Sequence, residues 1–458
     1  MRNLNELSKN FFHPNNPIIK SEIPHAFFSP YSIFVALFSK ITNLNAIQSL
    51  ECFAFFNLIF FLISYHLFCK TFFKDNYIIV APLSLFFILV FWGEGPFMWS
   101  GFFHIMVLNY VLPYPSTFTI ALVFMILFII LKNQTKNSPV FKIVSIILSS
   151  IVIITHPTTA IFLFVSVITL NLTYNQLSIK KSIIQSLLVI IPSAVLCLLW
   201  PYFNFLDLLT GNNYDFHKDS KTLYYGLITK NWPLIFIIPG FSYIKVDKTI
   251  CFFVITIILL SLIYIIGYLT KIYGISRVIS HIMIIAHLFT AYTLVLLIKQ
   301  SRIYSKLYLI TLSVALAISI SLNHRPLYRT LKNTIRKKNI EYYSKFNFLT
   351  NIVNSNDVII SDNYSNEFIP SFNGKVISTI NPLYWINDIE ERRDAVNLFF
   401  IKDSPNSLRQ LIIDKYNPDY ILIDSNEVNF DFITFQWLKS IGHTVYKKNK
   451  IELIKIDP

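Results

Sequence analysis

The sequence predicts a mainly α-helical membrane protein: a polytopic bundle of about ten transmembrane helices, followed by a small C-terminal α/β domain. Hydrophobic residues form 54% of the 458-residue chain and charged residues only 14%, whereas soluble domains carry roughly 25% charged residues. The stretch 249–270 has no formal charge, and a helix of that length crosses an apolar bilayer core of about 30 Å. Alternating apolar and charged stretches near the C-terminus predict the soluble domain.

The hydrophobic segments can be marked one by one along the chain. Two of them are short and lie on either side of His156-Pro157, and another contains Pro239 and Gly240. Broken helices are tolerated in membranes where protein or a water-filled cavity surrounds them. The ten predicted segments are 46–68, 77–93, 115–131, 143–155, 157–172, 183–200, 232–244, 249–270, 277–298 and 305–322.

Basic residues in short loops predict the orientation, because Lys and Arg are enriched in cytoplasmic loops. One set of loops is rich in them, which leaves loops 94–114 and 201–231 and both termini outside. The excess of 39 Lys and Arg over 25 Asp and Glu therefore reflects topology, and no nucleic-acid partner is expected. The chain is expected in the inner (plasma) membrane, in contact with the lipid bilayer. The cytoplasmic set contains Lys70, Lys74, Lys132, Lys136, Lys142, Lys180, Lys181, Lys245, Lys248, Lys299, Arg302 and Lys306.

Three regions follow from this pattern: an outer segment with an aromatic juxtamembrane helix at 1–45, the membrane domain at 46–322, and the extracytoplasmic α/β domain at 323–458. In the last region, 357–362, 375–379 and 419–424 read as strands, 390–401 as a helix and 443–456 as a hairpin. Residues 1–30 are polar and contain no signal peptide. Either a preceding membrane helix is missing and the chain is a shortened relative of a longer protein, or a short tail translocates unaided.

This architecture suits a transferase, a transporter or a structural protein. The sequence has no clear internal repeat, and its helix centres have no paired charges, which disfavours an ion-coupled transporter. The outer loops are long, aromatic and contain isolated acids, which favours chemistry at the outer membrane face.

Several short motifs occur in a characteristic order: FSPY (28–31), YPST (114–117), THPT (155–158) and YGISRV (273–278), then IPSFNGKVIS (369–378), Arg392-Arg393-Asp394 and DYILI (419–423) in the tail. This set resembles the bacterial GT-C membrane glycosyltransferases, relatives of the protein mannosyltransferase and aminoarabinose transferase type. The resemblance implies transfer of a sugar from a polyprenyl-phosphate carrier to a glycan, lipid or protein acceptor outside the cytoplasm. The alternative is a membrane protein for polysaccharide or lipid translocation or polymerisation.

The resembled family keeps an acidic base just after its first helix, and this sequence departs from that pattern because it has no such helix and no Asp before residue 75. If the chain is a shortened relative of an active transferase, it is expected to show little or no sugar transfer. Two of the acids before residue 323, Asp75 and Asp247, fall on the predicted cytoplasmic side. Glu94, between two glycines at a membrane edge, is the first candidate base and Glu22 the second. The alternative for Glu94 is an ordinary acid at a helix end. The nine acids are Glu6, Glu22, Glu51, Asp75, Glu94, Asp207, Asp215, Asp219 and Asp247.

The substrate-binding candidates are Arg277 and His156 for the lipid phosphate, and Trp92 and Tyr114, with Trp99, for stacking on sugar or lipid. Each has a simpler reading. Arg277 could snorkel at the interface, His156 could satisfy carbonyls that Pro157 leaves free, and the aromatic residues could belong to the interfacial belt. No metal and no cofactor are expected, because the outer acids and the four cysteines lack ligand spacing.

Overall fold

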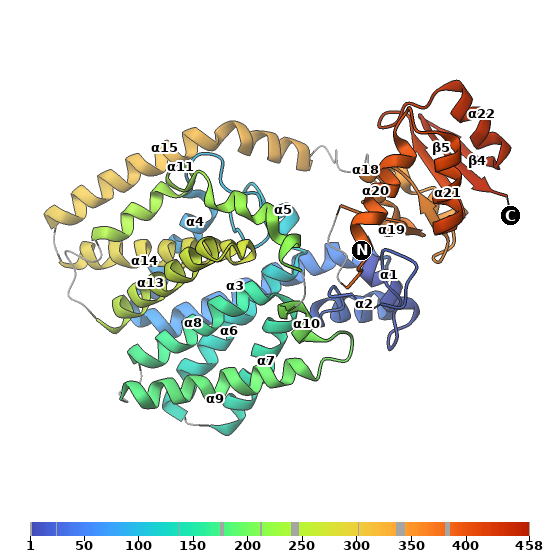
Figure 1. The fold of residues 1–458 in the computed structure, drawn as a ribbon. Helices are drawn as coiled ribbons and strands as arrows, with labels where there is room; N and C mark the ends of the chain where they lie inside the picture. The colour runs from blue at the N-terminus through green and yellow to red at the C-terminus, as the bar shows by residue number, and fades with distance from the viewer. Residues whose placement is uncertain are drawn as a thin grey trace. The chain divides into compact units, whose positions relative to one another are not determined.

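The computed structural model describes residues 2–457 apart from 24, 137, 175–177, 211–212, 240–246, 301, 336–343 and 381–384. The chain forms two compact units (Figure 1). The helical unit comprises residues 50–336, and the soluble unit comprises residues 1–49 together with 337–458.

The helical unit begins at Leu50, inside helix α3 (Ala46–Phe73). Seven helical stretches in the described part of the chain are long and apolar enough to span a membrane, so the predicted polytopic helical architecture is confirmed. The helices are α3 (Ala46–Phe73), η1 (Lys74–Asn76), α4 (Tyr77–Val90), α5 (Leu108–Val111), α6 (Pro115–Lys136), α7 (Pro139–Thr155), α8 (Pro157–Tyr174), α9 (Ile179–Leu198), α10 (Phe205–Thr210), η2 (Asn213–Tyr224), α11 (Leu227–Asn231), η3 (Trp232–Ile237), α13 (Lys248–Leu269), η4 (Tyr273–Arg277), α14 (Val278–Gln300) and α15 (Arg302–Ile335).

The helix α14 forms the centre of this unit. The most apolar window of the stretch Tyr273–Lys299 is 89% buried, whereas the other six spans are between 28% and 67% buried. It packs against α4, α8, α13 and α15 (Figure 1). Polar side chains of α14 are therefore enclosed by protein, where they can form hydrogen bonds with neighbouring segments.

Three differences from the predicted segments have local causes. The first two segments form one helical stretch, Ala46–Val90, with the 3₁₀ turn η1 between them. Residues 232–237 are a 3₁₀ helix in which Pro233 occupies the first turn, and residues 240–244 of that predicted segment lie outside the described residues. The last helix does not end at 322 but continues to Ile335, with Pro326 inside it.

The soluble unit contains a five-stranded mixed sheet of order β2-β1-β3-β5-β4. The strands β2, β1 and β3 are parallel, and β5 pairs antiparallel with both β3 and β4. The predicted small α/β domain with a partly parallel sheet and a closing hairpin is therefore confirmed. The strands are β1 (Val358–Ile360), β2 (Lys375–Val376), β3 (Tyr420–Asp424), β4 (Gly442–Lys448) and β5 (Ile451–Ile456).

Alternation along the strands gives this sheet two apolar faces. Val358, Ile360, Ile421 and Ile423 pack on one face against the longer helices. The opposite face carries Ile359 and Leu422 and is covered by shorter helices and by the N-terminal segment. The helices are α17 (Leu349–Ile352), α18 (Asn363–Asn366), α19 (Ile369–Phe372), α20 (Ile389–Phe400), α21 (Asn406–Tyr416) and α22 (Phe432–Ser440).

The N-terminal segment, with α1 (Arg2–Lys9) and α2 (Pro30–Thr42), is built into the soluble unit. The Val376 N–H donates to the Ile18 carbonyl at 2.9 Å, at the outer edge of β2, and Ile18 lies in the core. The Lys375 ammonium lies 2.7 Å from the Glu6 carboxylate and also donates to the Asn16 carbonyl at 2.6 Å. Both ends of the chain thus contribute to one core, a grouping that the division at 45/46 and 322/323 did not include.

The Glu6–Lys375 pair is deeply buried, with side-chain exposures of 8% and 2%. Burial lowers the pKa of Lys375, and the neighbouring Glu6 carboxylate opposes that shift. Such a pair holds the N-terminal segment in place because removing one partner leaves a buried charge without its counter-ion.

We expect Glu6→Ala to weaken the attachment of the N-terminal segment by about 3–5 kcal/mol, the usual effect of breaking a buried pair. Trypsin should then cleave after the exposed Lys20 at least about 100-fold faster than in the parent, as measured by mass spectrometry. The control is Lys9→Ala, because Lys9 is 46% exposed and 3.9 Å from Glu6. Equal cleavage rates in Glu6→Ala and the parent would contradict this role.

Candidate functional site

The chain between the end of α4 and Phe97 is irregular yet mostly buried; we call residues 91–97 the clamped segment. Helix α4 ends at Val90, so the backbone groups that follow need partners outside a helix. Side chains and carbonyls from four separate parts of the helical unit provide them: α14, α15, α11 and the loop that follows the segment.

Helix α15 binds the clamped segment through two polar residues one turn apart. The Trp92 N–H donates to the Ser319 hydroxyl at 3.1 Å, and that hydroxyl lies 2.6 Å from the Trp92 carbonyl. The Asn323 amide donates to the Gly93 carbonyl at 2.9 Å and accepts from the Gly95 N–H at 3.3 Å. Both functions of the Asn323 amide are thereby used, one on each side of Glu94.

Helix α11 binds the other side of the segment. The Gly93 and Glu94 N–H groups donate to the carbonyls of Lys230 and Thr229 at 2.9 and 3.0 Å. In return, the Lys230 ammonium donates to the Gly95 carbonyl at 3.0 Å and lies 4.5 Å from the Phe97 ring centroid. This reciprocal pairing fixes the chain on either side of Glu94.

Both glycines of the segment are required by this geometry. A Cβ atom at Gly93 would lie 2.0 Å from the Thr229 carbonyl oxygen, so no side chain fits there. Gly95 has a φ of +55°, a conformation that favours glycine. The sequence Gly-Glu-Gly therefore allows close backbone contact on both sides of a single acid.

Two histidines support the segment at its ends. The His287 Nε2–H of α14 donates to the Phe91 carbonyl at 2.7 Å, and the His104 Nε2–H donates to the Phe97 carbonyl at 3.1 Å. The Trp92 ring contacts both imidazoles, with centroid distances of 5.3 Å to His104 and 5.4 Å to His287. Burial lowers the pKa of His104 to about 4, so its ring is neutral at pH 7.

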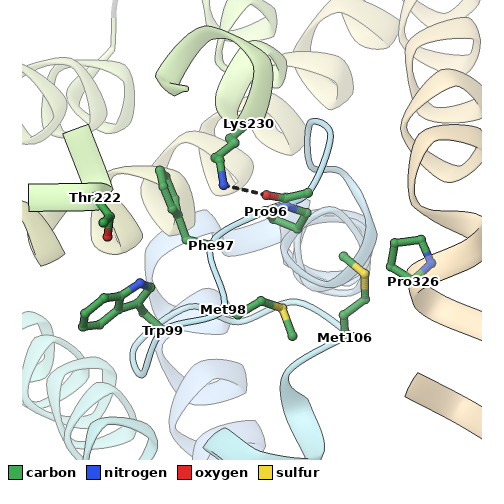
Figure 2. A pocket seen from close by; sticks show the side chains of 9 residues that line it. Pro96, Phe97, Met98, Trp99, Met106, Thr222, Lys230 and Pro326 are labelled. Atoms are coloured by element: carbon green, nitrogen blue, oxygen red, sulfur yellow. Dashed lines mark hydrogen bonds between the residues drawn. The ribbon is translucent and has the colours of Figure 1, made fainter. Parts of the chain in front are cut away.

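A cavity of about 410 Å³ opens beside the clamped segment (Figure 2). Both loops predicted to face outward, 94–114 and 201–231, contribute to its wall. Lys230 is the single charged side chain among the described lining residues, and Figure 2 shows its hydrogen bond to the Gly95 carbonyl as a dashed line. The lining consists of Gly95, Pro96, Phe97, Met98, Trp99, Met106, Thr222, Lys230 and Pro326.

Arg277 adjoins this cavity through Trp99. Its guanidinium carbon lies 5.2 Å from the Trp99 ring centroid. Burial raises the pKa of Tyr110 and the charge of Arg277 opposes that rise, and the Tyr110 ring lies 5.8 Å from the Tyr114 ring. Arg277 therefore contacts an aromatic residue of the cavity wall, and its charge acts on Tyr110 of a second aromatic pair.

His156 is linked to the same helix end through buried polar groups. It follows α7, and its Nδ1 lies 2.7 Å from the Thr159 hydroxyl on α8. That hydroxyl lies 3.4 Å from Nε2 of His281, whose neighbour Ser280 donates to the Arg277 carbonyl at 2.8 Å. The break between α7 and α8 is thus connected to the start of α14.

The predicted site residues are only partly brought together. Arg277 contacts Trp99 at the cavity wall and Tyr114 lies beside Tyr110, whereas Trp92 is a buried member of the clamped segment and does not line the cavity. Glu94 is exposed, and its side chain is not part of the described lining, although Gly95 is. Glu22 is exposed in the soluble unit. The described residues contain no group of three or more His, Cys, Asp or Glu side chains suited to a metal ion.

Sequence reasoning missed Ser319 and Asn323, which hold the segment, and gave Lys230 no role at a site. One signal was present: Ser319 and Asn323 are four residues apart, so they share a face of a helix whose other residues are mainly apolar. The predicted helix end at 322 separated the two, and the signal was lost.

Gly93→Ala should prevent formation of the clamped segment, because its methyl group would overlap a backbone oxygen. We expect a loss of several kcal/mol, beyond the usual 1–3 kcal/mol of overpacking, seen as a lower unfolding temperature of the purified protein. The matched control is Gly95→Ala, whose Cβ meets nothing within 4 Å and which should lose only about 1 kcal/mol through its positive φ. Equal unfolding temperatures for the two variants would show that the close contact at Gly93 is unimportant.

We compared the chain with known proteins by sequence and by structure, and only solved structures gave matches. No family model matches the chain, and no curated protein matches it in sequence. The solved structures that it resembles include the oligosaccharyltransferase of Archaeoglobus fulgidus, tethered with an acceptor peptide containing the NVT sequon via a disulfide bond (TM-score 0.51). The complex of that protein with Zn and sulfate gives a TM-score of 0.55.

Both matches have 11% sequence identity and cover 92% of this chain, but only 64% and 62% of the archaeal chain. Identity this low shows the fold alone. The chain therefore shares the fold of this archaeal oligosaccharyltransferase, and its described part contains seven helical stretches that are long and apolar enough to span a membrane.

Proposed function

We propose that this protein is a membrane glycosyltransferase that takes a sugar from a polyprenyl-phosphate donor and passes it to an acceptor outside the cytoplasm. One observation carries the proposal: two long loops, both predicted to face outward, meet around one cavity beside the rigidly held Glu94. The shared fold with an oligosaccharyltransferase supports the same reaction class.

Glu94 is the proposed general base. The acceptor hydroxyl oxygen forms a bond to the anomeric carbon of the sugar, and the bond from that carbon to the phosphate oxygen breaks. The hydroxyl proton passes to the Glu94 carboxylate, and polyprenyl phosphate leaves with the bonding electron pair. A positioned carboxylate can accelerate such a step by about 10²–10⁴-fold. Glu22 remains the second candidate base.

The leaving phosphate develops negative charge, which a nearby cation stabilises. Arg277 next to Trp99 is the proposed contact, since a guanidinium can bind two phosphate oxygens at once. Trp99 and Tyr114 are proposed to contact the sugar or the first isoprenoid units. His156 is proposed to act through the polar chain that reaches Ser280 and the Arg277 carbonyl.

The proposed orientation puts the cavity and the soluble unit outside the cytoplasm, in the cell's inner (plasma) membrane. It is supported by the basic residues of the opposite loops. Glycan, lipid and protein acceptors all provide a nucleophile for this chemistry.

In proteoliposomes that contain a radiolabelled polyprenyl-phosphate sugar and an acceptor extract, the protein should release free polyprenyl phosphate, detected by thin-layer chromatography. Glu94→Gln should slow release by about 10²–10⁴-fold, because the amide cannot accept the proton. The matched control is Glu51→Gln, which changes another exposed acid of the helical unit. Movement of intact lipid-linked sugar without cleavage would instead indicate a translocation protein, and full activity of Glu94→Gln would remove Glu94 from the mechanism.

Arg277→Ala should lose about 2–4 kcal/mol of transition-state stabilisation in kcat/KM for the donor, comparable to the loss of one oxyanion donor. Arg277→Lys should recover only part of this, because an ammonium lacks the planar, bidentate geometry. Arg329→Ala, which removes an exposed arginine of α15, serves as the control. Unchanged kinetics in a folded Arg277→Ala protein would assign the residue to interfacial anchoring.

A further inference from the structure

The geometry points to Asn323 as a positioning residue that fixes the main chain on both sides of Glu94. This inference rests on the proposed function only for its catalytic consequence; the structural part stands by itself. Asn323 lies on α15, 229 positions along the chain from Glu94, and no motif connects the two residues.

The Asn323 side chain is suited to this task because one planar group offers a donor and an acceptor together. It donates to Gly93 at 2.9 Å and accepts from Gly95 at 3.3 Å, so it bridges the two neighbours of Glu94. A second hydrogen bond, from Asn323 Nδ2 to the Ser319 carbonyl at 3.0 Å, fixes the amide on its own helix. With an exposed fraction of 7%, Asn323 forms these bonds where water competes little.

Asn323 holds this part of the segment from one side, while helix α11 binds it from the other. Glycines have the greatest backbone freedom of all residues, and Gly93 and Gly95 flank Glu94. The contacts from α11 also bind this stretch, but Asn323 alone among the described side chains bridges both glycines. Without that bridge, the two glycines keep only their contacts with α11, and the main chain at Glu94 gains freedom to move.

Two substitutions test the donor and the acceptor function of the Asn323 amide. Asn323→Leu has nearly the same shape and removes all three hydrogen bonds of the side chain. Asn323→Asp keeps an oxygen for the Gly95 N–H but turns a second oxygen toward the Gly93 carbonyl, which is repulsive. The matched control is Leu322→Ala, on the adjacent, 41% exposed position of the same helix.

The first measurement does not need enzymatic activity. In a variant without the natural residues Cys52, Cys69, Cys197 and Cys251, Glu94→Cys is labelled with a nitroxide, and its mobility is followed by electron paramagnetic resonance in proteoliposomes. We expect Asn323→Leu and Asn323→Asp to increase nitroxide mobility and Leu322→Ala to leave it unchanged. An unchanged spectrum in Asn323→Leu would overturn the inference, whatever the outcome of the transfer assay.

The second measurement tests whether the position of Glu94 affects the rate of sugar transfer. Asn323→Leu should lower kcat by about 10–100-fold, the order expected for a misplacement of about 1 Å, while the KM for the donor changes little. In the Glu94→Gln background, Asn323→Leu should lower the residual rate by no more than about twofold, since the group that it positions is gone. Equal losses in both backgrounds would show that Asn323 acts on overall folding instead. If the parent protein transfers no sugar, the proposed function fails and the nitroxide spectra alone decide this inference.

Discussion

The structure of the proposed site depends on satisfying the backbone polar groups of residues 91–97. These residues leave helix α4 in a largely buried environment, where an unpaired N–H or C=O costs on the order of 1–3 kcal/mol or more. The helical unit meets this requirement with hydrogen bonds from His287, Ser319, Asn323 and the carbonyls of α11. Because these partners come from helices that are far apart in the chain, the segment is rigid only when the whole bundle is assembled. The clamped segment therefore holds the backbone of Glu94 in one position next to the cavity.

The central helix α14 connects this segment with the second half of the site. His287 of α14 binds the end of α4, while Ser280 and His281 near the start of α14 lie between the Arg277 carbonyl and the break between α7 and α8. Polar side chains inside a membrane bundle are retained where other protein groups satisfy them. Here they join the proposed base segment, the proposed phosphate contact and His156 within one packed unit. A change at any of these positions is therefore expected to affect the others through α14.

The soluble unit follows a different principle, since the two ends of the chain build one core. Residues 16–19 add to the edge of β2, and Ile18 and Ile19 pack on the sheet face opposite α20 and α21. Covering an open strand edge protects it from pairing with other chains. The buried pair of Glu6 and Lys375 specifies this attachment, because each charge is stabilised only when the other is present.

Much of the fold followed from local patterns in the sequence. Uncharged stretches determined the membrane helices, because apolar length alone decides whether a helix can span a bilayer. Apolar runs bounded by polar residues in 357–362 and 419–424 indicated two of the strands, and His156-Pro157 indicated the break between two helices. The sequence also made Glu94 and Arg277 candidates for the site by their positions at membrane edges, and these two roles stay predictions. The tertiary structure alone decided that Ser319, Asn323 and Lys230 hold the Glu94 segment and that Glu6 belongs to the C-terminal domain. These pairings join residues more than a hundred positions apart, and no local periodicity encodes which distant side chain will satisfy a given backbone group.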